Sequence, residues 1–431
     1  MFSMNSDNPK ILILCNDFPP INSIGADRPY SWFIYFKDYD LYPVVITKNW
    51  IESGNSRFKT ILPKREEEVT PQGTIIRAKK IMTPSLWMTS VFGMRLSLIR
   101  RFFTLIEKLL GFNISLFDQH REIYKEAFKY LDNNNIELVI STGEPFILFK
   151  YGSKLKKKYK IKWVADYRDG WYLNHVTSIK KNSLIKLIRS VELKAEKKYI
   201  KNADLITTID PILADRLETF TKIKTKYVYN GFWNHITCRK TTKQNQNKLI
   251  LNHTGTLTNG QRIEVLLDVL VYLKEIDKIS KYSIELNLVG LEYFPDQMER
   301  VKKYKEKLKG ILVTTPRLKK EEANKMNLRA DYLINFTDEN YTAIYAKTYN
   351  YIACGKPILV IPGDNGLLDD IVTEHNLGTI LNTAREIEDF ITNPDVDFKP
   401  DPKNLEFFTR RNQTKIMSEI IKTQLINYDQ T

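Results

Sequence analysis

The chain has 431 residues, of which 42% are hydrophobic and 27% charged, and it carries a formal net charge of +15. The length exceeds one ordinary core and predicts two domains, while the composition, which has no low-complexity tract, excludes a disordered or fibrous protein. No zinc-finger, ribonucleoprotein or helix-turn-helix signature accompanies the positive charge, so we expect no nucleic-acid partner.

Short apolar, β-rich runs alternate with longer amphipathic stretches in the first half of the chain. Helical patterns at 120–132 and 182–201 separate several of these runs. This alternation predicts βαβ units and a parallel sheet. The expected buried strands are KILILCN (10–16), PVVIT (43–47), ELVIST (137–142), KWVADY (162–167), DLITTID (204–210) and KYVYN (226–230).

A second series of β-rich runs follows the polar stretch CRKTTKQNQNK, which has no apolar periodicity and which we interpret as a linker at 237–248. After the last run, a Pro/Asp-rich turn precedes a helical tail at 404–428. The strands expected in this half are LILNHTG (249–255), IELNLVG (284–290), GILVTT (310–315), DYLINF (331–336), PILVIPG (357–363) and LGTIL (377–381).

The sequence therefore predicts an α/β protein with two doubly wound, Rossmann-like domains. We expect the first domain at 1–236, the second at 249–403, and a C-terminal helix within 404–431 that packs back on the first domain. Open sheets of this kind bind ligands at the carboxyl ends of their strands, over helix N-termini. The site is thus expected in a central cleft that the two domains face.

The three cysteines, Cys15, Cys238 and Cys354, form neither a CxxC pair nor a zinc-ligand spacing, which indicates a reducing compartment. The first apolar run, within 10–16, is too short for a signal peptide, and no stretch reaches the roughly 18 apolar residues that a membrane span needs. We therefore expect a cytoplasmic protein.

Two basic segments leave an anionic membrane surface open as a partner. Residues 151–201 carry 15 Lys and Arg against four Asp and Glu, which is also what a solvated lysine-rich face would show. Residues 92–112 predict a basic amphipathic helix, which either lies on the inner face of the membrane or packs on the sheet or a partner subunit. Its apolar face carries Leu96, Ile99, Phe103, Ile106 and Leu110, and its cations are Arg95, Arg100, Arg101 and Lys108.

Six motifs occur in an order and spacing that resemble family-4 glycosyltransferases of the GT-B fold, especially the bacterial branch that builds surface polysaccharides. They are ILILCNDFPPINSIGADRP, VADYRDGW, NADLITTID, VYNGF, HTGTLTNGQR and AKTYNYIACGKPIL. The resemblance spans residues 10 to about 420. It implies transfer of a hexose or related sugar from a nucleotide-sugar donor to a saccharide or lipid-linked acceptor, with retention. It implies no cofactor and no metal, because cations and a helix dipole stabilise the leaving diphosphate.

The segment YAKTYNYIACGKPILVIPG, residues 345–363, corresponds in the resemblance to the donor-binding helix. There Lys347 and Thr348 would meet the diphosphate, and Asn350 stands where a ribose-binding Glu is usual. The alternative is a plain helix with a core face, which explains the apolar residues but not the lysine. The first Glu of the family's paired motif falls on Thr342, with Asp338 and Glu339 as nearby substitutes.

The loop in TGTLTNGQR follows a strand and opens a helix, so its backbone N–H groups could bind an anion. Arg262 would add a bidentate contact, and Thr256 and Gln261 stand near the positions of the family's usual cations. Arg262 and Lys347 are thus the expected catalytic cations. The expected donor-binding set is Gly25, Gly255, Thr256, Arg262, Arg317, Lys347, Thr348, Asn350 and Tyr351.

Acceptor contacts are expected in the first domain, where the candidates are Arg28, Glu144, Asp166, Arg168 and Asp169. For Arg28, Asp166 and Arg168 a structural salt bridge is the open alternative. A His that often contacts the donor sugar in the family is replaced here by Phe149. With Asn350, this departure supports a second reading, a catalytically impaired subunit that acts as a nucleotide-sugar-binding or interaction partner.

Overall fold

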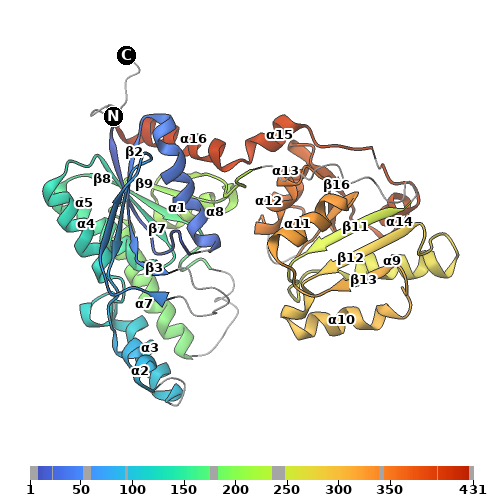
Figure 1. Ribbon diagram of the computed structural model, residues 1–431, viewed down its shortest axis with the longest axis horizontal. Helices are drawn as coiled ribbons and strands as arrows, with labels where there is room; N and C mark the ends of the chain where they lie inside the picture. The colour runs from blue at the N-terminus through green and yellow to red at the C-terminus, as the bar shows by residue number, and fades with distance from the viewer. Residues whose placement is uncertain are drawn as a thin grey trace. The chain divides into compact units, whose positions relative to one another are not determined.

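The computed structural model describes residues 8–21, 23–51, 60–92, 96–174, 183–234, 248–338, 344–395 and 397–426. It divides the chain into two compact units, each built around its own sheet (Figure 1). The first unit comprises Met1–Tyr229 with Gln413–Thr431, and the second comprises Asn230–Asn412. The expected linker at 237–248 lies outside the described residues except for Lys248.

The sheet of the first unit has eight strands in the order β10-β9-β8-β7-β1-β2-β6-β5. All neighbours pair in parallel except β5 and β6, which form an antiparallel edge hairpin. The strands are β1 (Lys10–Leu14), β2 (Tyr42–Lys48), β5 (Glu66–Val69), β6 (Thr74–Ala78), β7 (Leu138–Gly143), β8 (Lys162–Tyr167), β9 (Leu205–Thr208) and β10 (Thr225–Tyr227). A separate pair is formed by β3 (Trp50–Ile51) and β4 (Thr60–Ile61).

Helices cover both faces of this sheet, because its strands are apolar on both sides. Ile11 and Ile13 of β1 face the core that α1 and α16 complete, whereas Leu12 and Leu14 face α4, α5, α7 and α8. In Figure 1, α4 and α5 lie on one side of the sheet and α1 on the other. The helices are α1 (Ile24–Tyr35), α2 (Pro84–Phe92), α3 (Ser97–Leu110), α4 (Arg121–Asn133), α5 (Ile147–Tyr159), α7 (Ser183–Ile200), α8 (Pro211–Thr221) and α16 (Arg410–Ile421).

The helical tail is divided between the units. Met417 and Ile421 of α16 are fully buried in the first unit's core, together with Trp32 and Phe36. The shorter helix α15 (Pro402–Phe407) belongs to the second unit, where a Cβ on Gly355 would contact Leu405 at 3.7 Å.

The second sheet has six parallel strands in the order β13-β12-β11-β14-β15-β16. They are β11 (Leu249–Thr254), β12 (Ile284–Val289), β13 (Leu312–Thr315), β14 (Tyr332–Phe336), β15 (Ile358–Ile361) and β16 (Gly378–Ile380). One apolar core joins this sheet to α9 (Glu264–Glu275), α10 (Pro295–Lys305) and α14 (Ala384–Thr392). The other helices are α11 (Lys320–Arg329), α12 (Ala346–Ala353) and α13 (Leu367–Glu374).

Each of the twelve runs expected to be strands overlaps a strand, so the prediction of two doubly wound α/β domains is confirmed. The hairpin β5–β6 was not expected, because EEEV is a charged run on an exposed edge strand. Among the helices that the structure describes, none is long and apolar enough to cross a lipid bilayer.

Candidate functional site

In both sheets the strand order reverses at one place. In the second unit, β12 and β13 are added on one side of β11, and β14, β15 and β16 are then added on its other side. The first unit has the same reversal between β1 and β7. Open α/β sheets bind ligands outside the carboxyl ends of the strands at such a reversal. Ligand sites are therefore expected at these two edges.

Two glycines shape the edge of the second unit. Gly255, directly after β11, has φ +114°, and Gly290, directly after β12, has φ +89°. Side chains are strained in this left-handed region, so glycine is required at both positions. A Cβ on Gly290 would contact the backbone of both Gly255 and Arg317 at 3.9 Å. Three consecutive strand ends thus come together there, with exposed backbone at Gly255 and Thr256.

Lys347, in the first turn of α12, points at the buried ring of His253 at the end of β11. Its Nζ lies 3.4 Å from Nε2 of His253, while Nδ1 of that ring lies 2.9 Å from the carbonyl oxygen of Ile334. Because Nδ1 must donate to a carbonyl, Nε2 is left as an acceptor for the amine of Lys347. Burial and the charge of Lys347 hold the pKa of His253 well below its usual value, so the imidazole is neutral.

The charge of Lys347 is poorly compensated. Burial lowers the pKa of Lys347 to about 7, and burial alone produces this shift. Within the described residues, no carboxylate forms an ion pair that would oppose it. A desolvated amine at the end of a strand is in the state that an incoming anion would stabilise. Thr342, where the first Glu of the paired motif is expected, and the substitute Glu339 lie outside the described residues.

Three other residues of the predicted donor set form hydrogen bonds within the second unit next to this edge. The hydroxyl of Tyr351 accepts a hydrogen bond of 2.9 Å from the backbone N–H of Thr254, and burial raises the pKa of Tyr351 to about 12. Thr348 is fully buried and accepts from Nδ2 of Asn335. Asn350 is half-buried and donates to Asn324 of α11 at 3.0 Å. Tyr351 and Thr348 therefore position the strand end and the helix.

The loop at 258–262 is held from within the unit. Gln261 is buried, donates to the carbonyl of Phe336 at 2.6 Å and accepts from the N–H of Thr258 at 2.9 Å. Arg300 of α10 binds both oxygens of Glu264 and also the carbonyl oxygens of the loop. With the loop fixed in this way, the side chain of Arg262 extends to the surface.

Asp338 and Arg317 complete the edge. The carboxylate of Asp338, which follows β14, packs over Gly260, where a Cβ would lie 1.9 Å from its Oδ2. Arg317, after β13, is exposed, and its backbone N–H donates to the carboxylate of Glu292. The edge therefore carries three cations of the predicted set, Arg262, Arg317 and Lys347, of which Lys347 is the most deeply placed.

In the first unit, Gly25 and Arg168 come together at the reversal between β1 and β7. A Cβ on Gly25 would lie 2.2 Å from Nη1 of Arg168, so the glycine leaves room for the guanidinium. Nε of Arg168 donates to the carbonyl oxygen of Gly143 at 2.6 Å. Gly25 is the second residue of α1, and its N–H donates to the hydroxyl of Ser23, which caps the helix.

Arg28 and Asp166 form a buried ion pair with each other. Nη2 of Arg28 lies 2.8 Å from Oδ1 of Asp166, and the two side chains are 3% and 0% exposed. Nη1 of Arg28 also donates to the carbonyl of Val228 at 2.6 Å, and Thr207 donates to Asp166 at 2.8 Å. The sequence left an acceptor contact and a structural salt bridge open for these residues, and the structure shows the salt bridge. It connects α1 with β8 and with the chain after β10.

Glu144 and Asp169 are exposed at the same edge. Although Asp169 reaches solvent, the surrounding protein desolvates its carboxylate, and this desolvation and the neighbouring carboxylate of Glu144 raise the pKa of Asp169. Phe149, which stands where the family often has a His, is fully buried, with its ring 4.7 Å from that of Tyr167. It therefore belongs to the core, and the described first unit keeps Arg168, Glu144 and Asp169 as accessible polar groups at this edge.

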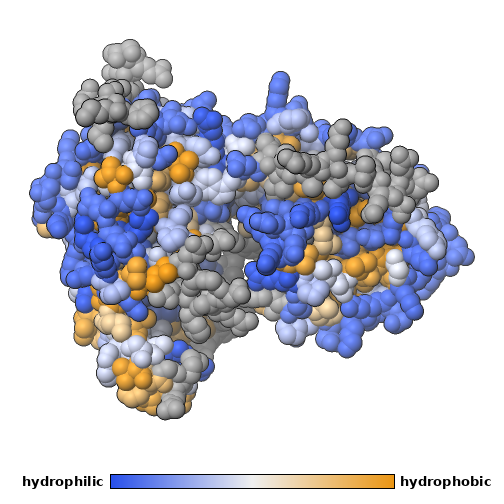
Figure 2. All heavy atoms as spheres, in the orientation of Figure 1, coloured by the Kyte–Doolittle hydropathy of each residue, from blue (hydrophilic) through white to orange (hydrophobic). Residues whose placement is uncertain are grey.

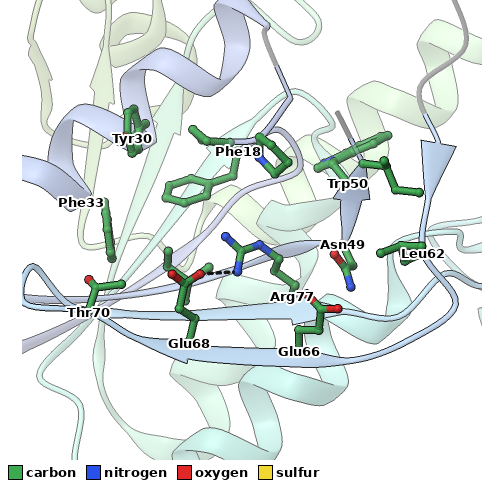
Figure 3. A pocket seen from close by; sticks show the side chains of 14 residues that line it. Phe18, Tyr30, Phe33, Asn49, Trp50, Leu62, Glu66, Glu68, Thr70 and Arg77 are labelled. Atoms are coloured by element: carbon green, nitrogen blue, oxygen red, sulfur yellow. Dashed lines mark hydrogen bonds and ion pairs between the residues drawn. The ribbon is translucent and has the colours of Figure 1, made fainter. Parts of the chain in front are cut away.

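A groove of about 610 Å³ lies between α1 and the hairpin β5–β6 (Figure 3). Tyr30 and Phe33 of α1, Phe18 before it and Trp50 after β2 give it aromatic walls. Arg77 projects into it from β6 and donates to Glu68 at 2.8 Å, with Glu66 beside them (Figure 3). Its floor is the hairpin β5–β6, which was not expected, so only the aromatic residues could have indicated the groove in advance.

No model of a protein family matches the sequence, and no curated protein matches it. Among the described residues, no three or more His, Cys, Asp or Glu side chains are grouped so that they could hold a metal ion.

Solved structures resemble the chain over almost its whole length. A sucrose-phosphate synthase from Thermosynechococcus elongatus has a TM-score of 0.61 at 13% identity, covering 97% of this chain and 100% of its own. A glycosyltransferase from Rickettsia africae has a TM-score of 0.59 at 13% identity, with coverages of 98% and 100%. HepE from Anabaena, in complex with UDP and glucose, has a TM-score of 0.54 at 12% identity, with coverages of 96% and 100%. The chain therefore has the GT-B fold that these glycosyltransferases share.

Proposed function

We propose that the chain is a retaining glycosyltransferase that moves a sugar from a nucleotide-sugar donor to a hydroxyl group of an acceptor. The observation that carries the proposal is the amine of Lys347, held by His253 at the end of β11 and lacking an ion-pair partner among the described residues. It lies in the first turn of a helix and near the exposed backbone at Gly255, a combination that suits a diphosphate.

In this proposal the second unit binds the donor. Lys347, Arg262 and Arg317 would balance the charge of the diphosphate, and the charge that develops as it leaves would be stabilised without a metal ion. Gly255 and Thr256 would offer backbone contacts, and Asn350 would hydrogen-bond the ribose. Because HepE is described in complex with UDP and glucose, UDP-glucose is the first donor to test.

The acceptor is assigned to the first unit and is proposed to be a saccharide, free or linked to a lipid. Sugar rings present C–H groups on their faces and hydroxyls at their edges, so aromatic walls with a few carboxylates suit them. The groove along α1 has both. Arg168, Glu144 and Asp169 are further polar groups at the carboxyl edge of the same sheet. From the resemblance of the six motifs we propose a role in surface-polysaccharide synthesis.

A second candidate is a subunit that binds a nucleotide sugar but has lost transfer. Phe149 favours it, because a side chain packed into the aromatic core offers nothing to a donor sugar. Asn350 favours it as well, since an amide binds a ribose diol without the strength of a charge-assisted hydrogen bond.

Release of nucleoside diphosphate from a panel of nucleotide sugars tests the proposal. The full chain is incubated with each donor, with and without mono- and disaccharide acceptors, and the released diphosphate is quantified. We expect one donor to be consumed and an acceptor to increase its consumption. Binding of a donor without any consumption would favour the impaired subunit, and neither binding nor consumption would contradict both candidates.

A further inference from the structure

The first unit carries an apolar surface that its own core does not use. The helices α2 and α3 and the 3-10 turn η2 (Ser115–Phe117) form a projection, called here the α2–α3 hairpin. Figure 2 shows the corresponding hydrophobic cluster at the lower end of this unit. Its large exposed apolar side chains include Trp87, Val91, Phe92, Leu98 (76%), Ile99 (47%), Phe102 (59%), Leu110 and Leu116.

None of the residues of α3 is buried, although the helix has a strongly amphipathic sequence. Phe103, Leu105, Ile106 and Leu109 are half-buried against the rest of the unit, whereas Leu98, Ile99 and Phe102 are exposed. Packing within the unit therefore covers only part of the apolar surface of this helix. The sequence allowed the 92–112 segment to lie on a membrane, on the sheet or on a partner subunit. The exposure of Leu98 and Phe102 excludes packing on the sheet. Arg95 of that segment lies outside the described residues.

The hairpin is nevertheless well anchored. Both carboxylate oxygens of Glu107 in α3 accept hydrogen bonds from Ser85 in α2, at 2.9 Å from its N–H and 2.6 Å from its hydroxyl. Between the helices lies an apolar hollow of about 400 Å³, lined by Met82, Trp87, Met88, Phe103 and Leu116 together with Thr83 and Pro84. Hydrogen bonds thus hold the two helices that carry the exposed apolar residues, and the apolar hollow between the helices could accept a hydrocarbon group.

The charges near the α2–α3 hairpin indicate which kind of partner binds its apolar surface. Between residues 79 and 117 the sequence has six cations, Lys79, Lys80, Arg95, Arg100, Arg101 and Lys108, and one acidic residue, Glu107, which binds Ser85. The hairpin contacts α7, where Lys186 stands between the exposed Leu184 and Leu187. A second copy would bring the same cations face to face. An anionic bilayer would attract them, each well-placed cation contributing roughly a fivefold gain in binding.

We propose that the α2–α3 hairpin docks this chain on anionic phospholipid membranes, with Leu98, Ile99 and Phe102 entering the headgroup region. Amphipathic basic helices with exposed aromatic residues bind bilayers in this way. The inference deepens the proposed function, because it gives the first unit access to an acceptor linked to a lipid.

Vesicle flotation tests the docking. The full-length protein is mixed with vesicles of phosphatidylglycerol and phosphatidylcholine, or of phosphatidylcholine alone, at low and high salt. We expect salt-sensitive binding to the anionic vesicles only. The affinity of the variant Leu98→Ser/Phe102→Ser for these vesicles should be at least about tenfold lower, because the variant removes exposed apolar area. Arg101→Glu should weaken binding at least about fivefold.

Matched controls separate the hairpin from general stickiness. Val69→Ser/Tyr282→Ser removes two side chains of similar exposure, 60% and 74%, outside the hairpin, and Lys302→Glu reverses an exposed charge of the second unit. Both should bind as the parent does. Equal binding by Leu98→Ser/Phe102→Ser and the parent, or no parental binding to anionic vesicles, would overturn the proposal.

Two further readouts keep the outcomes distinct. Sedimentation velocity in the absence of lipid would reveal a dimer that Leu98→Ser/Phe102→Ser dissociates; that result without vesicle binding replaces the membrane by a second copy and overturns the proposal. Nucleoside diphosphate binding is measured on the same variants and should be unchanged. Absence of nucleotide binding in the parent contradicts the proposed function and leaves the vesicle result to stand by itself.

Discussion

Nζ of Lys347 lies 3.4 Å from Nε2 of His253, a fully buried ring that a carbonyl fixes from its other side. The second unit thus maintains an amine, with a pKa of about 7, at the carboxyl end of β11. Holding a desolvated amine there costs folding free energy, and a bound phosphate would recover it. The predictions for this unit follow from that relationship.

The affinity for a nucleoside diphosphate should fall as the pH rises above about 7. Lys347 is charged below this pH and neutral above it, so binding at higher pH must take up a proton. Between pH 7.5 and 9.5, where the phosphate itself no longer titrates, we expect a loss of up to about tenfold per pH unit. Calorimetry in buffers of different ionisation enthalpy measures both effects. A flat affinity without proton uptake would contradict the assignment.

Replacing Lys347 by Met should stabilise the ligand-free protein while it weakens nucleotide binding. The pKa in the folded state, about 7, lies below the roughly 10.4 of an unfolded chain, so the unfolded state binds more protons between these values. The stability of the parent therefore rises with pH across this window. The Tm of the variant should exceed that of the parent most clearly below pH 7, with the difference vanishing near pH 10. An equal or lower Tm at pH 6 would show that the amine is not desolvated.

Tyr351→Phe should destabilise the second unit by about 1–3 kcal/mol, because the N–H of Thr254 loses its buried acceptor. Nucleotide affinity should fall as well, since Thr254 leads directly into Gly255. Denaturant unfolding measures the first effect and calorimetry the second. Tyr282→Phe, at an exposed tyrosine, is the control and should change neither. A neutral Tyr351→Phe would mean that the strand end does not depend on this hydroxyl.

Asp166→Ala should destabilise the first unit by about 3–5 kcal/mol, because it leaves Arg28 buried and uncompensated. Asp169→Ala, at an exposed carboxylate three residues along, should change stability little and affect acceptor use instead. Thermal unfolding of both variants decides between the structural and the acceptor role. Comparable stability in the two would contradict the structural role of Asp166.

Tyr30→Ser should weaken saccharide binding in the groove along α1 and leave nucleotide affinity unchanged. Tyr30 is half-buried on the groove wall, so its removal opens the groove with little loss of core. Saturation-transfer NMR with a panel of disaccharides measures the binding, with Tyr282→Ser as the matched control. If Tyr30→Ser gives the same saturation transfer as the parent, the groove is not the saccharide site.

The strands and their parallel order could be predicted because apolar runs alternate with amphipathic ones along the whole chain. The same pattern placed Gly255 at a carboxyl edge, because this residue ends the run at 249–255. Lys347 was expected near it from the resemblance to the donor-binding helix. Pairings across the fold could not be predicted in this way. His253 and Lys347 are 94 residues apart and meet because β14 returns to the side of β11.

Residue type alone also left roles undecided. Arg28 could have contacted a phosphate and Asp166 a sugar hydroxyl, but the two could equally form a buried ion pair, and their burial identifies the ion pair. Tyr351 could have contacted a ligand, but its hydroxyl is occupied by the backbone of Thr254. The groove along α1 depends on the hairpin β5–β6, whose charged edge strand has no strand-like alternation.

Calorimetric titration of UDP into the parent and into Lys347→Met, at pH 7 and low salt, tests the central claim most directly. Lys320→Met, at an exposed lysine of the same unit, is the control. The account predicts binding by the parent and the control, and a loss of about 2–5 kcal/mol in Lys347→Met, because a charge-assisted contact with the diphosphate disappears. Equal affinity of Lys347→Met and the parent would contradict it.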